Sequence, residues 1–309
     1  MAIDAIEQRY AAALERLVEQ IKQDRSILAA FLCGSLAHDR VWQGSDIDLA
    51  LVTVDDKKIQ ASSLALYADG INVHTFLFPR AQFRQMVSGA LQHSFIHSIL
   101  AKGRLLYTHD ETIADLSAML RSLGARDARV QLLRAATQAV ACLYKARKWL
   151  VTRGDLDYTA LWLLYAATPL AQIEVIAAGQ LVGREVIQQA LALNPPLFTA
   201  LYVDVLNAPK TRTLVAQALK AADQVLERRT AQVFAPLLEY LRETGEPRSA
   251  TEIETHFERT LGIGDAVTAC EYLSDRGLVA KVSLPVHLTK KSHVDVQELA
   301  FVHLGDGGR

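Results

Sequence analysis

The stretch from Phe31 to Val54 restricts the possible folds of this chain more than any other part of it. An apolar run ends at Gly34-Ser35, a polar connection follows, and a second apolar run opens with Asp46-Ile47-Asp48. Side chains two residues apart in a strand point to the same side, so we expect Asp46 and Asp48 to project together. Two adjacent like charges are unfavourable unless a positive group lies between them. A divalent cation with oxygen ligands, such as Mg²⁺, is the simplest such group.

Gly34 and Ser35 add a second half to this pattern. Glycine lets the backbone approach a ligand closely, and the N–H groups of a helix that starts after it attract an anion. A phosphate-binding turn beside two metal-binding carboxylates is typical of phosphoryl or nucleotidyl transfer. The alternative is an ordinary βαβ unit with a surface Ser-Asp-x-Asp turn. Asp-x-Asp alone would favour that alternative, but the combined pattern favours a transfer site.

These residues carry a family resemblance. Gly34-Ser35, the eleven residues from Ser35 to Asp46, and the Leu-Ala-Leu-Val that follows Asp48 resemble the signature of the polymerase-β-like nucleotidyltransferase superfamily. Kanamycin nucleotidyltransferase and the minimal nucleotidyltransferases belong to it. The resemblance covers the first third of the chain and says little about the substrate. It implies that the donor is an NTP, with ATP as the first choice, and that Gly34, Ser35 and Ser45 bind it. It also implies that Asp46 and Asp48 are catalytic and hold Mg²⁺ or Mn²⁺.

The pattern of apolar residues predicts an α+β fold in three domains. We expect a small mixed-sheet nucleotidyltransferase domain over residues 1–110, a helical bundle over 111–229 and a winged helix-turn-helix-like domain over 230–309. In the first domain we expect an amphipathic helix within 2–24, a short helix through 38–42, a helix or loop before the turn at 68–70, and a helix from Arg80 toward Gly103. The strands are expected at 27–33, 46–54, 71–78 and 103–107.

His74 is the main departure from the superfamily pattern. Related chains deliver a third carboxylate from the third of these strands, whereas this chain has Val73-His74-Thr75 there. Imidazole ligates manganese or zinc and is a poor partner for magnesium. Three roles stay open for His74: a metal or phosphate contact, a proton acceptor for the incoming hydroxyl, or a packed strand residue that marks lost activity.

Two features of the predicted bundle, an acid in an apolar helix and a short basic run, are candidates for a functional role. Glu174 is an acid in an otherwise apolar helix, and a buried carboxylate can act as a general base. The resembling kanamycin enzymes use a glutamate of the helical domain in that way. The alternative is a structural glutamate paired with Arg147 or Arg184. The basic run Lys145-Ala-Arg147-Lys148-Trp149 either faces nucleotide phosphates or is a solvated helix face.

The charge of the last domain argues against nucleic acid there. From Ala231 onward the chain has eight lysines and arginines against twelve aspartates and glutamates, whereas phosphate binding needs clustered positive charge. DNA therefore stays a disfavoured partner, and dimerisation or acceptor binding, including a homodimer, suits this domain better. The N-terminus lacks the pattern of a signal peptide, and the apolar stretch from Ala160 to Ile173 is interrupted, so we expect a cytoplasmic protein without a membrane partner.

Three functions fit these observations. The first is a metal-dependent nucleotidyltransferase that moves a nucleoside monophosphate from an NTP to a hydroxyl of a small molecule. The second is a degenerate nucleotidyltransferase-like domain that senses a ligand and acts through the winged helix. The third is an antitoxin-like enzyme whose acceptor is a protein side chain. The intact Gly-Ser and Asp-x-Asp patterns favour an enzyme, while His74 favours a sensor.

Overall fold

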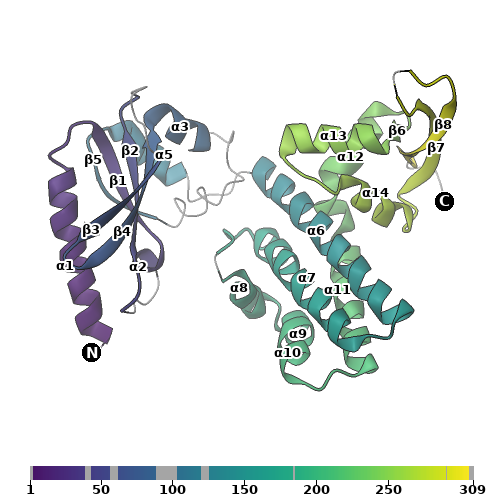
Figure 1. Ribbon diagram of the computed structural model, residues 1–309, viewed down its shortest axis with the longest axis horizontal. Coiled ribbons are helices and arrows are strands. Elements are labelled where there is room, and N and C mark those ends of the chain that lie inside the picture. Colours follow the sequence, from purple (N-terminus) through teal and green to yellow (C-terminus); the bar gives the residue numbers. More distant parts are fainter. Residues whose placement is uncertain are drawn as a thin grey trace. The chain divides into compact units, whose positions relative to one another are not determined.

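The computed structural model describes residues 3–38, 43–55, 62–87, 103–119, 125–183, 185–289 and 291–305. The chain divides into two compact units, residues 1–127 and 128–309 (Figure 1). The first contains a mixed sheet and the second is largely helical, so the expected α+β class is confirmed. The finer division into three domains stays a prediction.

A five-stranded mixed sheet lies at the centre of the first unit, with the strand order β3-β4-β2-β1-β5. Strands β2 and β4 run parallel, and the other neighbours run antiparallel. The elements of this unit are α1 (Ile3–Ile21), β1 (Ile27–Cys33), α2 (Ser35–His38), β2 (Ile47–Thr53), β3 (Ser63–Ala68), β4 (Ile71–Pro79), α3 (Arg80–Val87), β5 (Arg104–Thr108) and α5 (Glu111–Met119). The four expected strands are therefore confirmed. The expected helix at 38–42 and the later part of the one after Arg80 lie largely outside the described residues.

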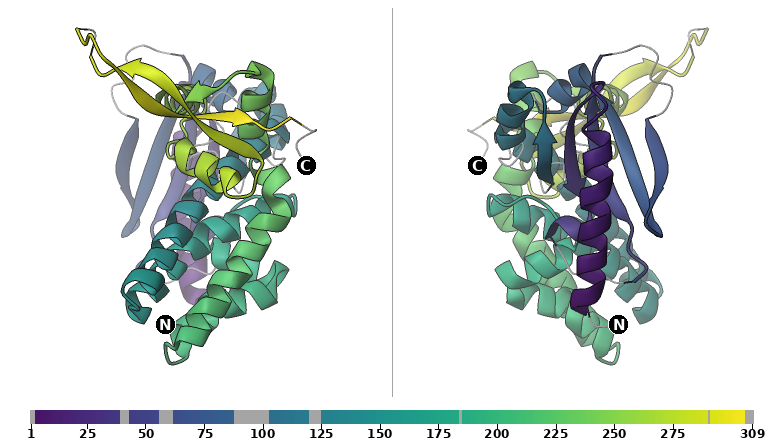
Figure 2. Two further views of the ribbon diagram at one scale, coloured as in Figure 1. Left: turned by 90° about the vertical axis from the view of Figure 1, so that its right-hand side faces the viewer. Right: turned by 90° about the vertical axis from the view of Figure 1, so that its left-hand side faces the viewer.

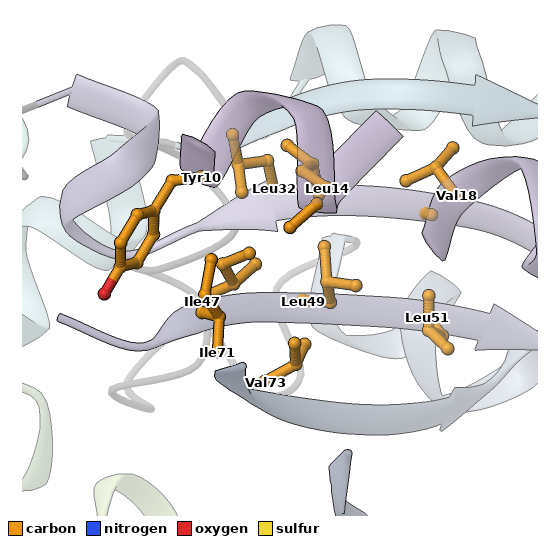
Figure 3. Close-up of a cluster of buried hydrophobic side chains, with 11 residues drawn as sticks. Tyr10, Leu14, Val18, Leu32, Ile47, Leu49, Leu51, Ile71 and Val73 are labelled. Carbon is orange, nitrogen blue, oxygen red and sulfur yellow. The ribbon is translucent and has the colours of Figure 1, made fainter. Parts of the chain in front are cut away.

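Helix α1 covers one face of the sheet. Alternate residues of β2 point toward α1, which covers them with Tyr10, Leu14 and Val18 (Figure 3). The buried side chains from the strands include Leu32, Ile47, Leu49, Leu51, Ile71 and Val73. This alternation leaves the other side chains of β2 and β4 on the opposite face. In β2, the residues at even distance from Ile47 therefore face α1, and those at odd distance face the other side of the sheet.

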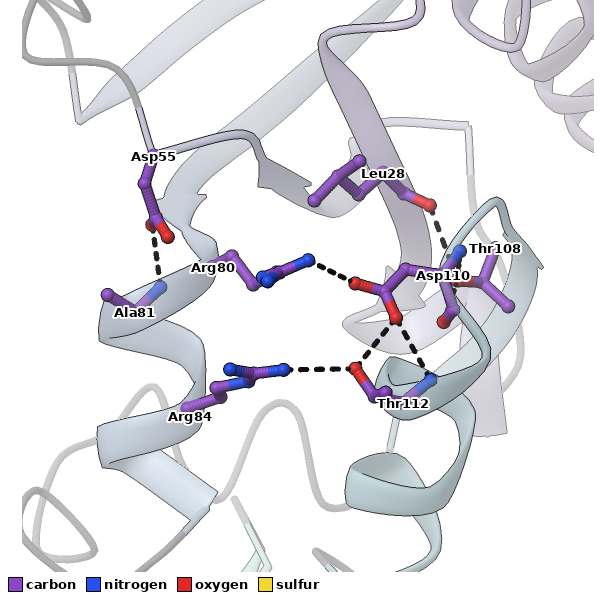
Figure 4. A network of polar contacts seen from close by, with 8 residues as sticks. All are labelled: Leu28, Asp55, Arg80, Ala81, Arg84, Thr108, Asp110 and Thr112. Atoms are coloured by element: carbon purple, nitrogen blue, oxygen red, sulfur yellow. Dashed lines mark hydrogen bonds and ion pairs between the residues drawn. The ribbon is translucent and has the colours of Figure 1, made fainter.

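Helices α3 and α5 pack on the opposite face. Phe31 of β1 contacts Phe83 of α3, with ring centroids 5.5 Å apart. Asp110 joins the two helices, because it accepts from the Arg80 guanidinium at 2.8 Å and from the Thr112 hydroxyl at 2.7 Å (Figure 4). The same network includes Arg84, which donates to the Thr112 hydroxyl at 3.3 Å. These polar contacts lie beyond the C-terminal ends of β4 and β5, so they are at the opposite end of the sheet from the start of β2.

The expected helix or loop before residues 68–70 is wrong in part, because Ser63–Ala68 form strand β3. It pairs antiparallel with β4 across a two-residue turn at Asp69 and Gly70. Both turn residues have positive φ, 51° and 78°, which is the geometry of a tight hairpin. Helix α1 holds this turn, since Arg16 pairs with Asp69 at 2.7 Å. The Asp-Gly pair was the sequence signal for this hairpin.

The second unit contains a helical region followed by a small sheet. Its elements are α6 (Ala125–Thr152), α7 (Leu156–Ala177), α8 (Val186–Leu193), α9 (Pro195–Phe198), the π-helical turn η1 (Thr199–Val203), α10 (Asp204–Asn207), α11 (Arg212–Val233), α12 (Ala235–Thr244), β6 (Arg248–Ser249), α13 (Ala250–Leu261), α14 (Ala266–Ser274), β7 (Val279–His287) and β8 (Asp295–His303). Helix α7 is the one described helix long and apolar enough to span a membrane. However, 61% of its most apolar stretch is buried inside the protein, as in a core helix.

The last elements follow the order expected from the sequence. Helix α13 is preceded by its N-cap Ser249, in a capping box in which Ser249 and Glu252 bond each other's backbone. A turn leads to α14, and β7 and β8 then form an antiparallel pair that reaches away from the helices of this unit (Figure 2). The two-residue strand β6 adds to β8 and was not expected. Helix, turn, helix and strand pair are thus present, and their use as a winged helix stays a prediction.

Candidate active site

Asp46, Asp48 and His74 lie together at the start of two neighbouring parallel strands. Asp46 directly precedes β2, Asp48 is its second residue, and His74 of β4 is in register with Asp48. The Nδ1 atom of His74 lies 3.6 Å from Oδ1 of Asp48 and 3.8 Å from Oδ2 of Asp46. These distances are too long for hydrogen bonds and lie within ion-pair range. The structure therefore brings the two aspartates and the histidine into one group.

The position of this group follows from the strand pattern. Ile47, Leu49 and Val73 point into the core under α1, so Asp48 and His74 point to the opposite face. The side chains are accessible there, with exposed fractions of 36% for Asp46, 29% for Asp48 and 53% for His74. The group is thus built on rigid strands and open to a ligand.

Gly34 gives Asp48 the space that it occupies. Its φ of +67° lies in the left-handed region, which L side chains rarely adopt. A Cβ atom on residue 34 would lie 2.0 Å from Oδ2 of Asp48 and 2.9 Å from its Cγ. No side chain fits at that separation. Glycine at position 34 is therefore required by the Asp48 carboxylate as well as by the turn.

Cys33 is held beside Asp48 and is chemically quiet. The thiol is buried, and the two residues are in register between β1 and β2. Burial, with the negative charge of Asp48 as a second cause, raises the pKa of Cys33 to about 12. The thiol is protonated at neutral pH, so Cys33 is a packing residue and not a nucleophile.

Tyr10 positions the segment that leads into Asp46. Its ring is 3% exposed within the α1 core, and its hydroxyl donates to the carbonyl of Ser45 at 2.6 Å and to that of Gln43 at 3.3 Å. The sequence pattern identified Tyr10 only as one apolar position of the helix. A buried tyrosine needs a partner for its hydroxyl, and that was the available signal for this role.

The remaining nucleotide-binding predictions are only partly described. Ser35 is the first residue of α2, and the Gly34 carbonyl accepts from the amide of Ala37 at 3.2 Å. Ser45 lies directly before Asp46 in the segment that Tyr10 holds. Gly34 thus lies against Asp48 and Ser45 leads into Asp46, while triphosphate binding by Gly34, Ser35 and Ser45 stays a prediction.

The two aspartates suit a magnesium ion whose other ligands come from a nucleotide and from water. Among the described residues, no group of three or more histidine, cysteine, aspartate or glutamate side chains is arranged to hold a metal by itself. Magnesium usually takes one or two carboxylates from the protein and the rest from phosphate and water. Asp46 and Asp48 fit that share of the ligands, whereas His74 is a poor ligand for magnesium.

Glu174 lies in the second unit and has two partners. Its Oε1 accepts from Nε of Arg229 at 2.7 Å, and its Oε2 accepts from Nδ2 of Asn194 at 3.0 Å. The expected pairing with Arg147 is wrong, because Arg147 bonds both carboxylate oxygens of Asp223. Arg184, the other expected partner, lies outside the described residues. Buried and bonded at both oxygens, Glu174 has the contacts of a structural carboxylate, and its role as a general base stays a prediction.

The sheet order, the Gly-Ser turn and the paired aspartates define a nucleotidyltransferase-like domain. Residues 15–112 match the family model described as polymerase beta, nucleotidyltransferase. The expected resemblance to the polymerase-β-like nucleotidyltransferase superfamily is therefore confirmed for this part of the chain.

A solved structure extends the likeness of fold to nearly the whole chain. The crystal structure of a nucleotidyltransferase-like protein from Exiguobacterium sibiricum 255-15 aligns with a TM-score of 0.63 over 97% of this chain and 99% of that one. The two sequences are 16% identical, so this likeness concerns the fold alone. No curated protein matches the sequence.

Proposed function

We propose that the chain is a metal-dependent nucleotidyltransferase, which transfers a nucleoside monophosphate from an NTP to a hydroxyl group. The observation that supports this most is the pair Asp46 and Asp48 at one strand end, with the Asp48 carboxylate packed against Gly34, where no side chain fits. Asp46 and Asp48 would hold Mg²⁺ or Mn²⁺, which would neutralise negative charge on the phosphates when bound. ATP is the proposed donor, as in the resembling enzymes, and the cytoplasm is the proposed location.

The chain's own residues would hold the reactants in line. The backbone around Gly34 and Ser35, together with Ser45, would bind the triphosphate. The acceptor oxygen forms a bond to the α-phosphorus while the bond from that phosphorus to the pyrophosphate oxygen breaks. The acceptor proton passes to His74, whose accessible imidazole lies beside Asp48 and whose position in the sequence is the one expected for the third carboxylate. Among the roles left open for His74, a proton acceptor suits its weak affinity for magnesium best.

Pyrophosphate release tests this proposal. Wild type would be assayed with ATP and the other NTPs, with Mg²⁺ and with Mn²⁺, across hydroxyl acceptors of small molecules and proteins. Asp46→Asn and Asp48→Asn should each reduce release at least a hundredfold. The control Asp69→Asn changes an exposed aspartate of the β3–β4 turn and should leave it unchanged. Release that survives both site substitutions would refute the assignment of the site.

A nucleotide sensor is the second candidate, and His74 is the observation that favours it. If the missing third carboxylate had ended catalysis, Gly34, Ser35, Asp46 and Asp48 would still be present to bind a nucleotide. Tight nucleotide binding that depends on Asp48, without release of pyrophosphate under any condition, would establish the sensor and exclude the enzyme. The winged helix formed by α13, α14, β7 and β8 would then be the element that reports binding.

A further inference from the structure

Four aromatic side chains form a continuous row where α6 meets α7. The ring centroids are 4.4 Å apart for Trp149 and Tyr158, 6.4 Å for Tyr158 and Trp162, and 5.4 Å for Trp162 and Tyr165. The three residues from α7 recur at helical spacing and so share one face of that helix. Tyr158 is 40% exposed and Tyr165 is 54% exposed. This aromatic row therefore reaches solvent through its two tyrosines.

Two lysines of α6 lie close to Trp149 along the helix. Lys145 lies four residues before Trp149 and hence on the same face of α6, whereas Lys148 directly precedes Trp149 and projects from an adjacent part of the helix surface. Both are exposed, and neither forms an ion pair within the part of the chain that the structure describes. Arg147 differs, because its guanidinium is bound to Asp223 at 2.6 Å. Lys145 and Lys148 thus keep their charge available for a ligand.

The charge of the surrounding region has the same sign. Residues 125–230 contain thirteen lysines and arginines against eight aspartates and glutamates, whereas the region from Ala231 onward is acidic. The near-zero net charge of the whole chain conceals this difference. A positive region attracts anionic partners and raises their rate of association. The aromatic row therefore lies in a region of net positive charge, with Asp155 and Asp157 as the acids next to Tyr158 in the sequence.

We propose that the aromatic row, with Lys145 and Lys148, binds single-stranded nucleic acid. Unpaired bases would stack on Tyr158 and Tyr165, and the two lysines would contact the backbone phosphates. Proteins that bind single strands combine aromatic stacking surfaces with a positive groove in this way. A double helix hides the base faces that the tyrosines need, and an uncharged saccharide would leave the lysines without a function. The proposal concerns binding and does not depend on the proposed catalysis.

Fluorescence anisotropy of short labelled oligonucleotides tests the site on the full chain. Single-stranded RNA and DNA of mixed sequence would be compared at low salt, with duplexes of the same sequence beside them. Tyr158→Ala and Tyr165→Ala should each weaken single-strand binding about tenfold, the loss expected for one stacked base. The double variant Lys145→Glu/Lys148→Glu should lower the slope of log K against log salt by about 1.4, for two lost phosphate contacts.

Matched controls separate this site from general effects of charge and surface. Tyr67→Ala removes a tyrosine of β3 that is 76% exposed, and Arg242→Glu reverses one positive charge on α12, whereas the lysine variant reverses two on α6. Both should leave binding at the wild-type level, and all variants should keep the wild-type melting temperature. Absence of single-strand binding, or equal losses in the controls, would overturn the proposal. So would a neutral oligosaccharide whose binding needs the tyrosines and ignores the lysines.

Discussion

Replacing Gly34 by alanine should strain the backbone at residue 34 and displace the Asp48 carboxylate. The φ of +67° puts any other residue in the left-handed region, which costs roughly 1–2 kcal/mol. The new Cβ would also lie 2.0 Å from Oδ2 of Asp48, so the carboxylate or the strand must move. Overpacking of this kind typically costs about 1–3 kcal/mol. The expected destabilisation is thus about 2–5 kcal/mol, unless Asp48 swings away and gives up its place.

Gly70→Ala is the matched control in the same unit. Its φ is +78°, so the backbone penalty is similar, but the new Cβ would meet the far end of the Arg9 side chain at 3.1 Å and the Tyr67 hydroxyl at 3.9 Å, both at side-chain ends. Hydrogen exchange of the β1 and β2 amides reports on this unit within the full chain. We expect faster exchange in Gly34→Ala than in Gly70→Ala, together with weaker Mn²⁺ binding. Equal exchange and unchanged Mn²⁺ affinity would refute the argument that Gly34 makes room for Asp48.

Three further substitutions test separate parts of the structure. Tyr10→Phe should lower Mn²⁺-nucleotide affinity severalfold with little change in fold, because the Ser45 carbonyl loses its donor; unchanged affinity would exclude the positioning role. Asp110→Asn tests pH dependence, since hydrogen bonds from Thr112 lower the pKa of Asp110, and its contribution is present above about pH 4 and is lost as the pH falls further. The difference in unfolding free energy between wild type and Asp110→Asn should therefore shrink as the pH falls below about 4. A difference that stays the same at every pH would contradict this. Arg229→Met should cost about 2–4 kcal/mol of unfolding free energy because it leaves Glu174 buried without its charge partner, whereas a neutral result would show that Asn194 suffices.

Much of the sheet followed from local patterns in the sequence. The runs at 27–33 and 46–54 are bounded by glycine, serine and aspartate, and their apolar residues have no competing helical period. The family resemblance predicted that the strand with His74 delivers this side chain toward the two aspartates, whereas the parallel pairing and its register were not predicted. Pairing between strands far apart in sequence depends on long-range packing, which periodicity does not encode.

The contacts around the site were harder to predict than the site residues. The hydrogen bond from Tyr10 to the Ser45 carbonyl joins residues 35 positions apart, and the close approach of Gly34 to Asp48 depends on the register of β1 and β2. Strand β3 was missed because its exposed side chains weaken the alternation that marks a strand. The aromatic row likewise became visible only when α6 and α7 were placed side by side.

Binding of Mn²⁺ in the presence of a non-hydrolysable ATP analogue tests the central claim most directly. Electron paramagnetic resonance of Mn²⁺ would be measured for wild type, Asp48→Asn, His74→Asp and the surface control Asp69→Asn. If Asp46 and Asp48 hold the metal, Asp48→Asn should weaken Mn²⁺ binding at least tenfold and Asp69→Asn should not. His74→Asp restores a third carboxylate and should tighten it. Mn²⁺ affinity that is the same in all four proteins would contradict the claim that this strand end is a metal and nucleotide site.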